Sequence, residues 1–137
     1  MKREPKWPSK TLIVAMHREL IKQYGGFYAL RDESLLESAL AKPQQKFASE
    51  ESATIFDLAA SLGYGLAKNH PFADGNKRIA FTAMGVFLTI NGFEITATEV
   101  DAVVTILGVA DGSVSESELA EWLRENHQGI VAKCQKR

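Results

Sequence analysis

Cysteine is nearly absent from the sequence, and long apolar runs are absent altogether. Cys134 is the only cysteine, so the chain can form neither an intramolecular disulfide nor a zinc site built on cysteines. No segment approaches the roughly 20 apolar residues that a membrane span needs. Residues 1–8 are charged and contain proline, unlike a signal peptide. We therefore expect a cytoplasmic protein that makes no contact with a membrane.

An excess of charge of either sign is missing as well. The chain has 16 basic and 17 acidic residues, which give a formal net charge of -1. No overall positive field is present to attract the phosphates of nucleic acid. We expect no direct nucleic-acid partner.

The composition is that of an ordinary globular protein. Hydrophobic residues make up 45% and charged residues 24% of the 137 residues. A chain of this length can bury one core but not two independent ones. We expect a single domain over residues 1–137 whose core spans about 9–126, with 127–137 as a flexible tail.

The hydrophobic pattern has helical spacing over most of the chain. It predicts an all-α bundle of about six helices, over residues 11–24, 33–40, 53–69, 78–91, 100–110 and 117–126. The helix at 78–91 is apolar on nearly every side, as is typical of the buried central helix of a domain. Residues 93–95 are expected to form a short extended segment.

Local signals indicate where these helices begin and end. Four residues are suited to be N-caps: Ser9, Asp32, Thr96 with Glu99 three residues later, and Ser115 with Glu118 three residues later. Pro43 is expected to stop the second helix, because proline removes a helical hydrogen bond. Gly63 and Gly65 weaken the third helix by about 1 kcal/mol each relative to alanine. We expect these glycines to permit close helix packing.

The segment HPFADGNKR, residues 70–78, lies between the third and fourth expected helices and is far more polar than either. Gly75 lets the backbone approach a ligand, and the helix start that follows offers unpaired N–H groups and a positive dipole end. Both features favour bound phosphate. Lys77 and Arg78 add positive charge. Asp74 is suited to hold Mg²⁺, which binds phosphate oxygens together with a carboxylate.

His70 is the one side chain here whose ordinary pKa, about 6.5, allows it to act as a neutral general base near physiological pH. Pro71 fixes the local backbone, and Phe72 is expected to anchor the loop in the core. Taken singly, the glycine turn and His70 are also compatible with a plain turn and a structural histidine. The combination of all these residue types within nine positions favours a phosphate site.

The segment resembles the Fic motif, which reads HPF, any residue, Asp or Glu, GN, Gly or Lys, and Arg, at every specified position. The resemblance to the Doc branch, the death-on-curing toxins of toxin–antitoxin modules, extends through GGFYALRDESLLESALAKPQ, FDLAASLGYGLAKN and NGFEI. It covers about residues 9–126 and implies the all-α Fic/Doc fold. It also implies that His70 is the base, that Asp74 binds Mg²⁺, and that Gly75, Asn76, Lys77 and Arg78 bind the nucleotide phosphates.

Lys77 is the informative position of the motif. Adenylylating Fic proteins usually have glycine there, whereas Doc-like proteins with lysine resemble kinases that bind ATP in the opposite direction. The resemblance therefore implies a toxin that transfers the γ-phosphoryl group of ATP to a Ser or Thr hydroxyl of a protein, with elongation factor Tu as the expected target. Two alternatives stay open: an AMP transferase acting on a protein hydroxyl, and a non-catalytic module that binds a nucleotide or an anionic partner.

Some Fic proteins carry a self-inhibiting helix with Ser or Thr four residues before a Glu-Gly or Glu-Asn pair. The only such pair here, Glu125-Asn126, has Glu121 at that position, so the motif is absent. The resemblance then implies a separate, Phd-like antitoxin whose tail folds into an apolar groove near the N-terminal helices.

Two features outside the motif are noted. His17 lies among apolar helix residues and is interpreted as structural. Arg31-Asp32 is either a surface ion pair of little energetic value or part of a substrate-facing surface.

Overall fold

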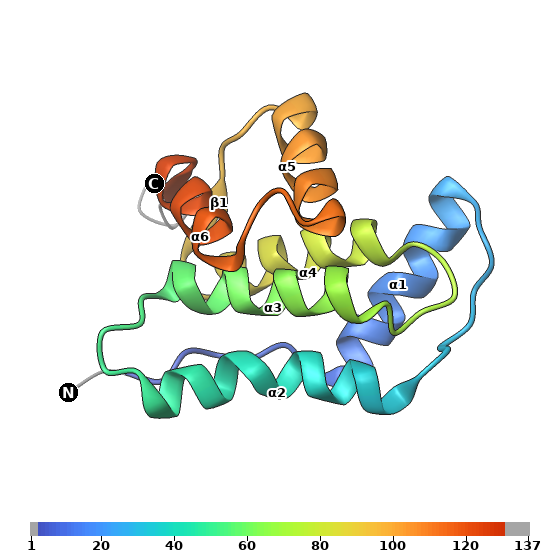
Figure 1. Ribbon diagram of the computed structural model, residues 1–137, viewed down its shortest axis with the longest axis horizontal. Helices are drawn as coiled ribbons and strands as arrows, with labels where there is room; N and C mark the ends of the chain where they lie inside the picture. The colour runs from blue at the N-terminus through green and yellow to red at the C-terminus, as the bar shows by residue number, and fades with distance from the viewer. Residues whose placement is uncertain (1–2, 131–137) are drawn as a thin grey trace, which may run out of the picture.

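The computed structural model describes residues 3–130, in which six α-helices and two short strands are found (Figure 1). The elements are α1 Lys10–Tyr24, α2 Glu33–Ser49, α3 Ile55–Asn69, α4 Asn76–Ile90, β1 Phe93–Ile95, α5 Glu99–Asp111, α6 Glu116–Glu125 and β2 His127–Gly129. This confirms the prediction of an all-α fold with six helices. None of these helices combines the length and the hydropathy that crossing a bilayer requires.

Helix α3 runs through the middle of the molecule, with α2 on one side and α5 and α6 on the other (Figure 1). It also packs along α4. Every residue from Leu58 to Ala67 except Tyr64 is buried. The helix predicted to be central, now α4, is buried along one face, while Phe81 and Val86 on its other face are only partly covered. The core is therefore centred on α3, and α4 keeps an open face.

The two glycines of α3 sit where neighbouring helices come closest. A Cβ atom on Gly63 would lie 2.4 Å from Cγ of Met84 in α4, and one on Gly65 would lie 3.3 Å from Cβ of Ala39 in α2. Both distances are too short for an ordinary carbon contact. The expected role of these glycines in close packing is confirmed.

Most of the predicted helix starts are confirmed. The side chains of Ser9 and Asp32 accept hydrogen bonds from backbone N–H groups of α1 and α2, and Ser115 forms the predicted capping box with Glu118. The capping box at Thr96 is wrong, because Thr98 is the N-cap of α5. The N–H of Thr96 instead donates to the carbonyl of Asn126, 2.8 Å away.

The prediction that Pro43 stops the second helix is also wrong, since α2 continues to Ser49. The proline ring is buried in the core, beside Trp7 and Leu62. Packing of this kind offsets the lost helical hydrogen bond, which costs about 3 kcal/mol in an isolated helix. The extra turns also bring Phe47 into edge contact with Trp7, with ring centroids 6.1 Å apart.

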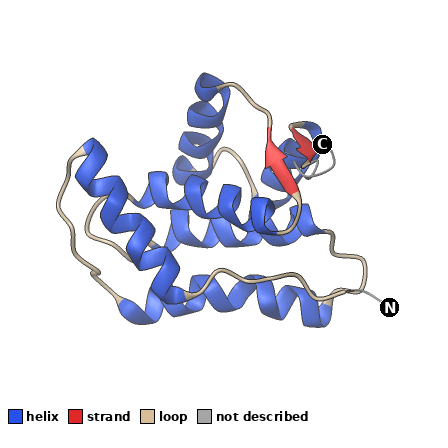
Figure 2. Cartoon of the chain, turned by 180° about the vertical axis from the view of Figure 1, so that it is seen from behind, coloured by secondary structure: helices blue, strands red, loops and turns tan. Residues whose placement is uncertain are grey.

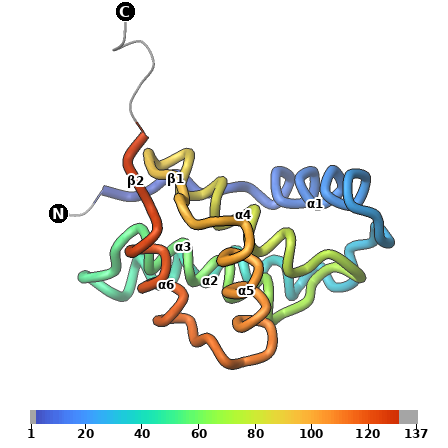
Figure 3. Tube along the Cα trace, turned by 90° about the horizontal axis from the view of Figure 1, so that it is seen from above, coloured from blue at the N-terminus to red at the C-terminus, as the bar shows by residue number. Residues whose placement is uncertain are grey.

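Part of the predicted tail is ordered. Residues 127–129 form β2, which pairs antiparallel with β1 and places Ile95 opposite His127 (Figures 2 and 3). The ring of His127 packs 4.2 Å from that of Phe56 on α3. This ladder and ring contact order a segment that was expected to be flexible, and the rest of the predicted tail, 131–137, lies outside the described residues.

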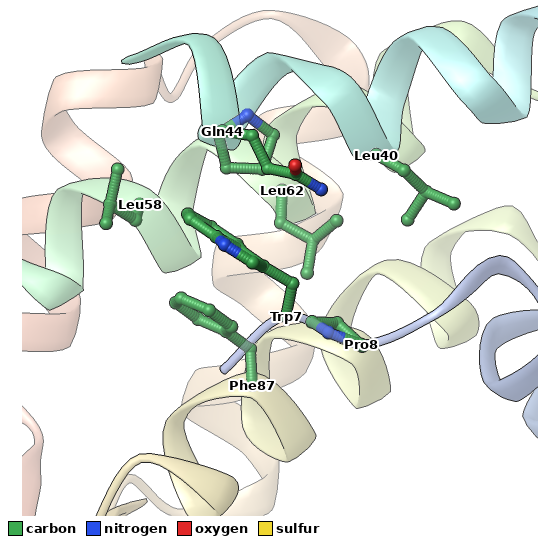
Figure 4. Close-up of a pocket in the computed structure, with 8 residues that line it drawn as sticks. Trp7, Pro8, Leu40, Gln44, Leu58, Leu62 and Phe87 are labelled. Carbon is green, nitrogen blue, oxygen red and sulfur yellow. The ribbon is translucent and has the colours of Figure 1, made fainter. Parts of the chain in front are cut away.

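The segment before α1 also packs on the core. The indole of Trp7 stacks on the ring of Phe87, with centroids 5.5 Å apart, and Figure 4 shows it lying between Phe87 and Leu62. The cavity left beside it has a volume of only about 10 Å³, room for no more than one water molecule. Trp7 therefore closes the end of the core between α2, α3 and α4.

Candidate active site

The loop between α3 and α4 begins and ends with a left-handed residue. His70 is the C-cap of α3, with φ 52° and ψ 55°, and Gly75 is the N-cap of α4, with φ 76°. A Cβ atom on Gly75 would lie 3.2 Å from Cδ1 of Ile21 and 3.3 Å from Nε2 of His17, so a larger residue has no room there. These two bends make a short loop that projects His70 into solvent.

Asn76 holds the loop from inside. Its Oδ1 accepts a hydrogen bond from the N–H of Phe72 at 3.0 Å, and its Nδ2 donates to the carbonyl of the same residue at 2.9 Å. The side chain is buried, and Phe72 is buried with Pro71 beneath the loop. Asn76 therefore shapes the loop, and a phosphate contact from this residue would have to come through its backbone N–H.

A second loop, residues 25–32, supports the first from outside. The N–H of Ala73 donates to the carbonyl of Ala29 at 3.0 Å, and the N–H groups of Arg31 and Asp32 both donate to the carbonyl of Pro71. This short bridge joins two segments that are about 40 residues apart in the sequence. The His70 loop is thus held from inside by the side chain of Asn76 and from outside by backbone hydrogen bonds.

His17 on α1 lies directly beneath the loop and is completely buried. Its ring stacks on Phe72 with centroids 3.7 Å apart, and Nε2 lies 2.7 Å from the carbonyl oxygen of Asp74. Because a carbonyl only accepts, Nε2 carries the proton, and Nδ1 has no hydrogen-bond partner. Burial lowers the pKa of His17, outweighing the opposing effect of the bond to Asp74. The neutral imidazole therefore supports the loop through its stacking on Phe72 and its hydrogen bond to Asp74.

The first turn of α4 has an unusual charge. Helices α2, α3, α5 and α6 carry Asp or Glu in their first turn, as the helix dipole favours, and α4 carries Lys77 and Arg78 instead. No side chain caps its N-terminus. Two exposed cations beside open N–H groups disfavour the free helix and favour a bound anion. The guanidinium of Arg78 lies 4.6 Å above the ring of Tyr24, a cation–π contact.

Asp74 is exposed at the same helix start. Its Oδ1 accepts from the N–H of Gly75 at 3.1 Å and its Oδ2 from the N–H of Phe27 at 3.2 Å, so the carboxylate has a fixed direction. Among residues 3–130 no group of three or more His, Cys, Asp or Glu side chains could hold a metal. A single carboxylate fits Mg²⁺, which takes its other ligands from phosphate and water, and fits poorly a metal that needs several protein ligands.

A groove of about 1030 Å³ starts at this helix end. Its polar end is formed by Asp74, Gly75, Lys77 and Arg78, and its apolar floor includes Phe81, Val86, Ile95, Ala102, Val103 and Ile106. The groove runs between α4, β1 and α5, and α1 contributes only Leu20 and Tyr24. The groove was expected near the N-terminal helices. It lies instead mainly between α4, β1 and α5, and of the N-terminal helices only α1 borders it.

His70 is exposed beside the groove and is not part of its lining. Its Nδ1 lies 3.5 Å from Nδ2 of Asn76, at the outer limit of a hydrogen bond, so this contact does not fix which ring nitrogen carries the proton. Nε2 can accept a proton from a substrate hydroxyl only when Nδ1 carries the ring proton. The imidazole is placed where it can meet a large substrate arriving from solvent.

Known proteins resemble this chain over the segment that contains the loop. The model of the Fic/DOC family matches residues 7–88, more than half of the chain. The chain belongs to the Fic/DOC family. Two relatives with Doc in their names extend the match. "Protein kinase doc" of Escherichia phage P1 is 32% identical over 112 residues, 82% of this chain and 88% of the relative. "Toxin Doc" of Mycolicibacterium smegmatis is 41% identical over 75 residues, 54% of this chain and 58% of the relative.

The structure brings four of the residues singled out in the sequence, Asp74, Gly75, Lys77 and Arg78, to one end of the groove. The side chains of Pro71, Phe72 and Asn76 are buried and support the loop from inside. The interpretation of His17 as structural is confirmed, but its place beneath the loop and the contacts of Arg31 with the loop were not predicted. Their hydrogen bonds join residues that are 39 to 57 positions apart, so no local sequence pattern predicts them.

Proposed function

We propose that this Fic/DOC protein is a toxin that uses Mg²⁺ and ATP to phosphorylate a Ser or Thr hydroxyl of a protein. The observation that carries the proposal is the uncapped N-terminus of α4, where Lys77 and Arg78 stand in place of the usual acidic residues beside Asp74. Such a helix end is suited to a polyphosphate. The names of the two relatives, a protein kinase and a toxin, give independent support.

Four side chains of the loop and of the α4 start have roles in this reaction. The imidazole of His70 takes the proton of the target hydroxyl as the hydroxyl oxygen forms a bond to the γ-phosphorus. The bond from that phosphorus to the bridging oxygen breaks, and ADP leaves with the electron pair. Lys77, Arg78 and the N–H groups of α4 hold the phosphates, since phosphoryl transfer demands positioning and charge stabilisation more than covalent chemistry. Mg²⁺ bound through Asp74 would neutralise phosphate charge.

The first experiment separates the kinase from an AMP transferase. The purified protein is incubated with Mg²⁺, cell extract and ATP labelled on either the γ or the α phosphate. We expect protein labelling from γ only, and none with His70→Ala. Labelling from α would show an AMP transferase, and no His70-dependent labelling from either would favour the binding module.

A matched pair of lysine variants tests the phosphate-binding end. Lys77→Ala removes a cation from the α4 start, while Lys22→Ala removes another exposed cation, which pairs with Glu19 on α1. We expect transfer to fall by roughly 10-fold or more with Lys77→Ala, as loss of a charged contact to phosphate implies, and to be unchanged with Lys22→Ala. Equal activity of both variants would contradict the role of Lys77.

The proposed target is elongation factor Tu, whose modification would arrest translation. Purified elongation factor Tu is incubated with the protein and Mg²⁺-ATP and weighed by intact mass spectrometry. We expect one added phosphate that depends on His70. An unmodified factor in a reaction that labels another protein of the extract would overturn this choice of target and leave the kinase activity standing.

We further propose that a Phd-like antitoxin restrains the enzyme by placing a helix in the groove. Val100, Val103, Val104 and Leu107 leave α5 with an exposed apolar face, and Val103 and Leu107 of this face line the groove. Amphipathic helices bind such grooves through apolar residues on one face. Val103→Glu puts a charge in the groove lining, whereas Val100→Glu puts it on the same helix outside the lining. We expect the cognate antitoxin to lose its neutralising effect in cells only with Val103→Glu, and equal neutralisation of both variants would count against this binding site.

A further inference from the structure

The C-terminal end of α3 is unusual because a histidine occupies the left-handed position. His70 is the only non-glycine residue with positive φ among residues 3–130. That conformation costs an L-residue about 1–2 kcal/mol, and helices that end in it usually use glycine at this position. A conformation of this kind persists only when surrounding contacts fix it. The question is which group fixes the backbone of His70.

Arg31 makes those contacts from the neighbouring loop. Its Nε donates to the carbonyl of His70 at 3.1 Å, and its Nη2 donates to the same carbonyl and to that of Asn69 at 3.4 Å. These carbonyls belong to the last turn of α3, where helical partners are missing and the helix dipole favours a cation. The planar guanidinium can bond two oxygens at once in a fixed geometry.

The backbone of the same residue completes the arrangement. The N–H groups of Arg31 and Asp32 donate to the carbonyl of Pro71 at 2.8 and 3.0 Å. The side chain and backbone of one short segment thereby hold three consecutive carbonyls, those of Asn69, His70 and Pro71. Fixing the carbonyls on both sides of the His70 Cα atom fixes the direction in which its imidazole leaves the chain.

Arg31 has no part in the other end of the site. It is not in the lining of the groove, where Lys77 and Arg78 are found, and the hydrogen bonds of its side chain go to the carbonyls of Asn69 and His70. Its effect on His70 is therefore separable from nucleotide binding.

We propose that Arg31 is a positioning residue for His70, holding the left-handed C-cap of α3 so that the imidazole points at the acceptor hydroxyl. This inference rests on the proposed function, since it assigns a role in the same transfer reaction. It predicts that losing the guanidinium lowers kcat while ATP affinity stays the same. A misplaced base of this kind costs roughly 10- to 100-fold in rate.

Arg124→Ala is the matched control for Arg31→Ala. Arg124 hydrogen-bonds Asp57 in the first turn of the same helix, α3, at 3.0 Å, so its loss weakens α3 at the end remote from the loop. We expect kcat for γ-phosphoryl transfer to fall roughly 10- to 100-fold with Arg31→Ala and to stay at the wild-type value with Arg124→Ala. ATP binding by calorimetry is unchanged in both. Arg31→Lys recovers part of the rate, because an ammonium group can still donate to one of the carbonyls.

Two further readouts separate positioning from mere stabilisation. In a double-mutant cycle, we expect the Arg31→Ala/His70→Ala double variant to have the same residual rate as His70→Ala alone. The reason is that Arg31 acts only through the His70 imidazole. The carbon–proton NMR signal of the His70 ring shifts in Arg31→Ala and not in Arg124→Ala. Equal rates per folded molecule for Arg31→Ala and wild type, or an unchanged His70 signal, would overturn the proposal. If the wild-type protein transfers no phosphate, the proposed function fails, and the His70 signal still decides whether Arg31 fixes the ring.

Discussion

At the scale of single residues, the candidate active site depends on two buried polar side chains that do not face the substrate. His17 supports the loop through Phe72 and the carbonyl of Asp74, and Asn76 bridges the N–H and carbonyl of Phe72. Asn76 satisfies two buried backbone groups that would otherwise be desolvated without a partner, and His17 satisfies a partly buried carbonyl. The reactive side chains on the surface depend on these contacts for a defined geometry.

Asn76→Ala tests this dependence. The substitution leaves the buried N–H and carbonyl of Phe72 unpaired, so we expect the free energy of unfolding to fall by roughly 2 kcal/mol or more. Asn91→Ala is the control, because Asn91 makes a similar set of bonds to Lys6 and Phe87 near the surface, where water can replace them. Urea denaturation measures both. An Asn76→Ala cost no larger than that of Asn91→Ala would contradict the role of Asn76 in holding the loop.

At the scale of elements, α3 combines weak local propensity with strong packing. Gly63 and Gly65 disfavour an isolated helix, yet they let α4 and α2 approach it closely. Because His70 follows directly on α3 and Asn76 starts α4, the spacing of these two helices also sets the spacing across the candidate active site. The packing that stabilises the core therefore positions the reactive loop.

Gly63→Ala and Gly85→Ala form a matched pair for this point. Both substitutions improve helix propensity by up to about 1 kcal/mol. A Cβ atom on Gly63 meets buried Met84 at 2.4 Å, while one on Gly85 has nothing nearer than Cδ1 of Ile95 at 4.0 Å. We expect Gly63→Ala to destabilise the fold by about 1–3 kcal/mol through overpacking, and Gly85→Ala to stabilise it, in thermal or urea unfolding. Stabilisation by both would show that α3 and α4 are not tightly packed at Gly63.

At the scale of the whole molecule, the N-terminal end of α3 is tied to α6 by Asp57. This carboxylate completes the capping box with Thr54 and accepts a hydrogen bond from Arg124, 3.0 Å away. Partial burial favours a higher pKa for Asp57, but the hydrogen bonds from Thr54 and Arg124 outweigh it and hold the pKa below its ordinary 3.8. The contact links two helices that are distant in sequence.

The pH dependence of stability follows from that lowered pKa. A carboxylate whose folded pKa lies below its unfolded pKa contributes stability above the unfolded value and loses it as pH falls through the folded value. We expect the difference in thermal midpoint between wild type and Asp57→Asn to be full above about pH 5 and to shrink as the pH falls below about 4. A difference that stays constant from pH 7 to pH 2.5 would rule out the ionised Asp57 as its source.

The sequence by itself determined features that depend on neighbours a few residues away. The N-caps at Ser9 and Asp32 and the capping box at Ser115 follow from bonds within one turn of helix. The HPFADGNKR segment identifies the family for the same reason, because its chemistry lies in nine consecutive residues. The roles of its residues, the dependence on Mg²⁺ and ATP, and the single-domain boundary stay predictions.

Only the tertiary structure decided the features that depend on distant segments. Pro43 stays inside α2 because the core covers it, and residues 127–129 form a strand because β1 lies beside them. The same is true of His17 and Arg31, whose loop partners lie 57 and 39 residues away. Long-range packing and hydrogen bonding outweigh local preferences of a few kcal/mol at these positions. Such contacts leave no periodic or local pattern in the sequence from which they could be predicted.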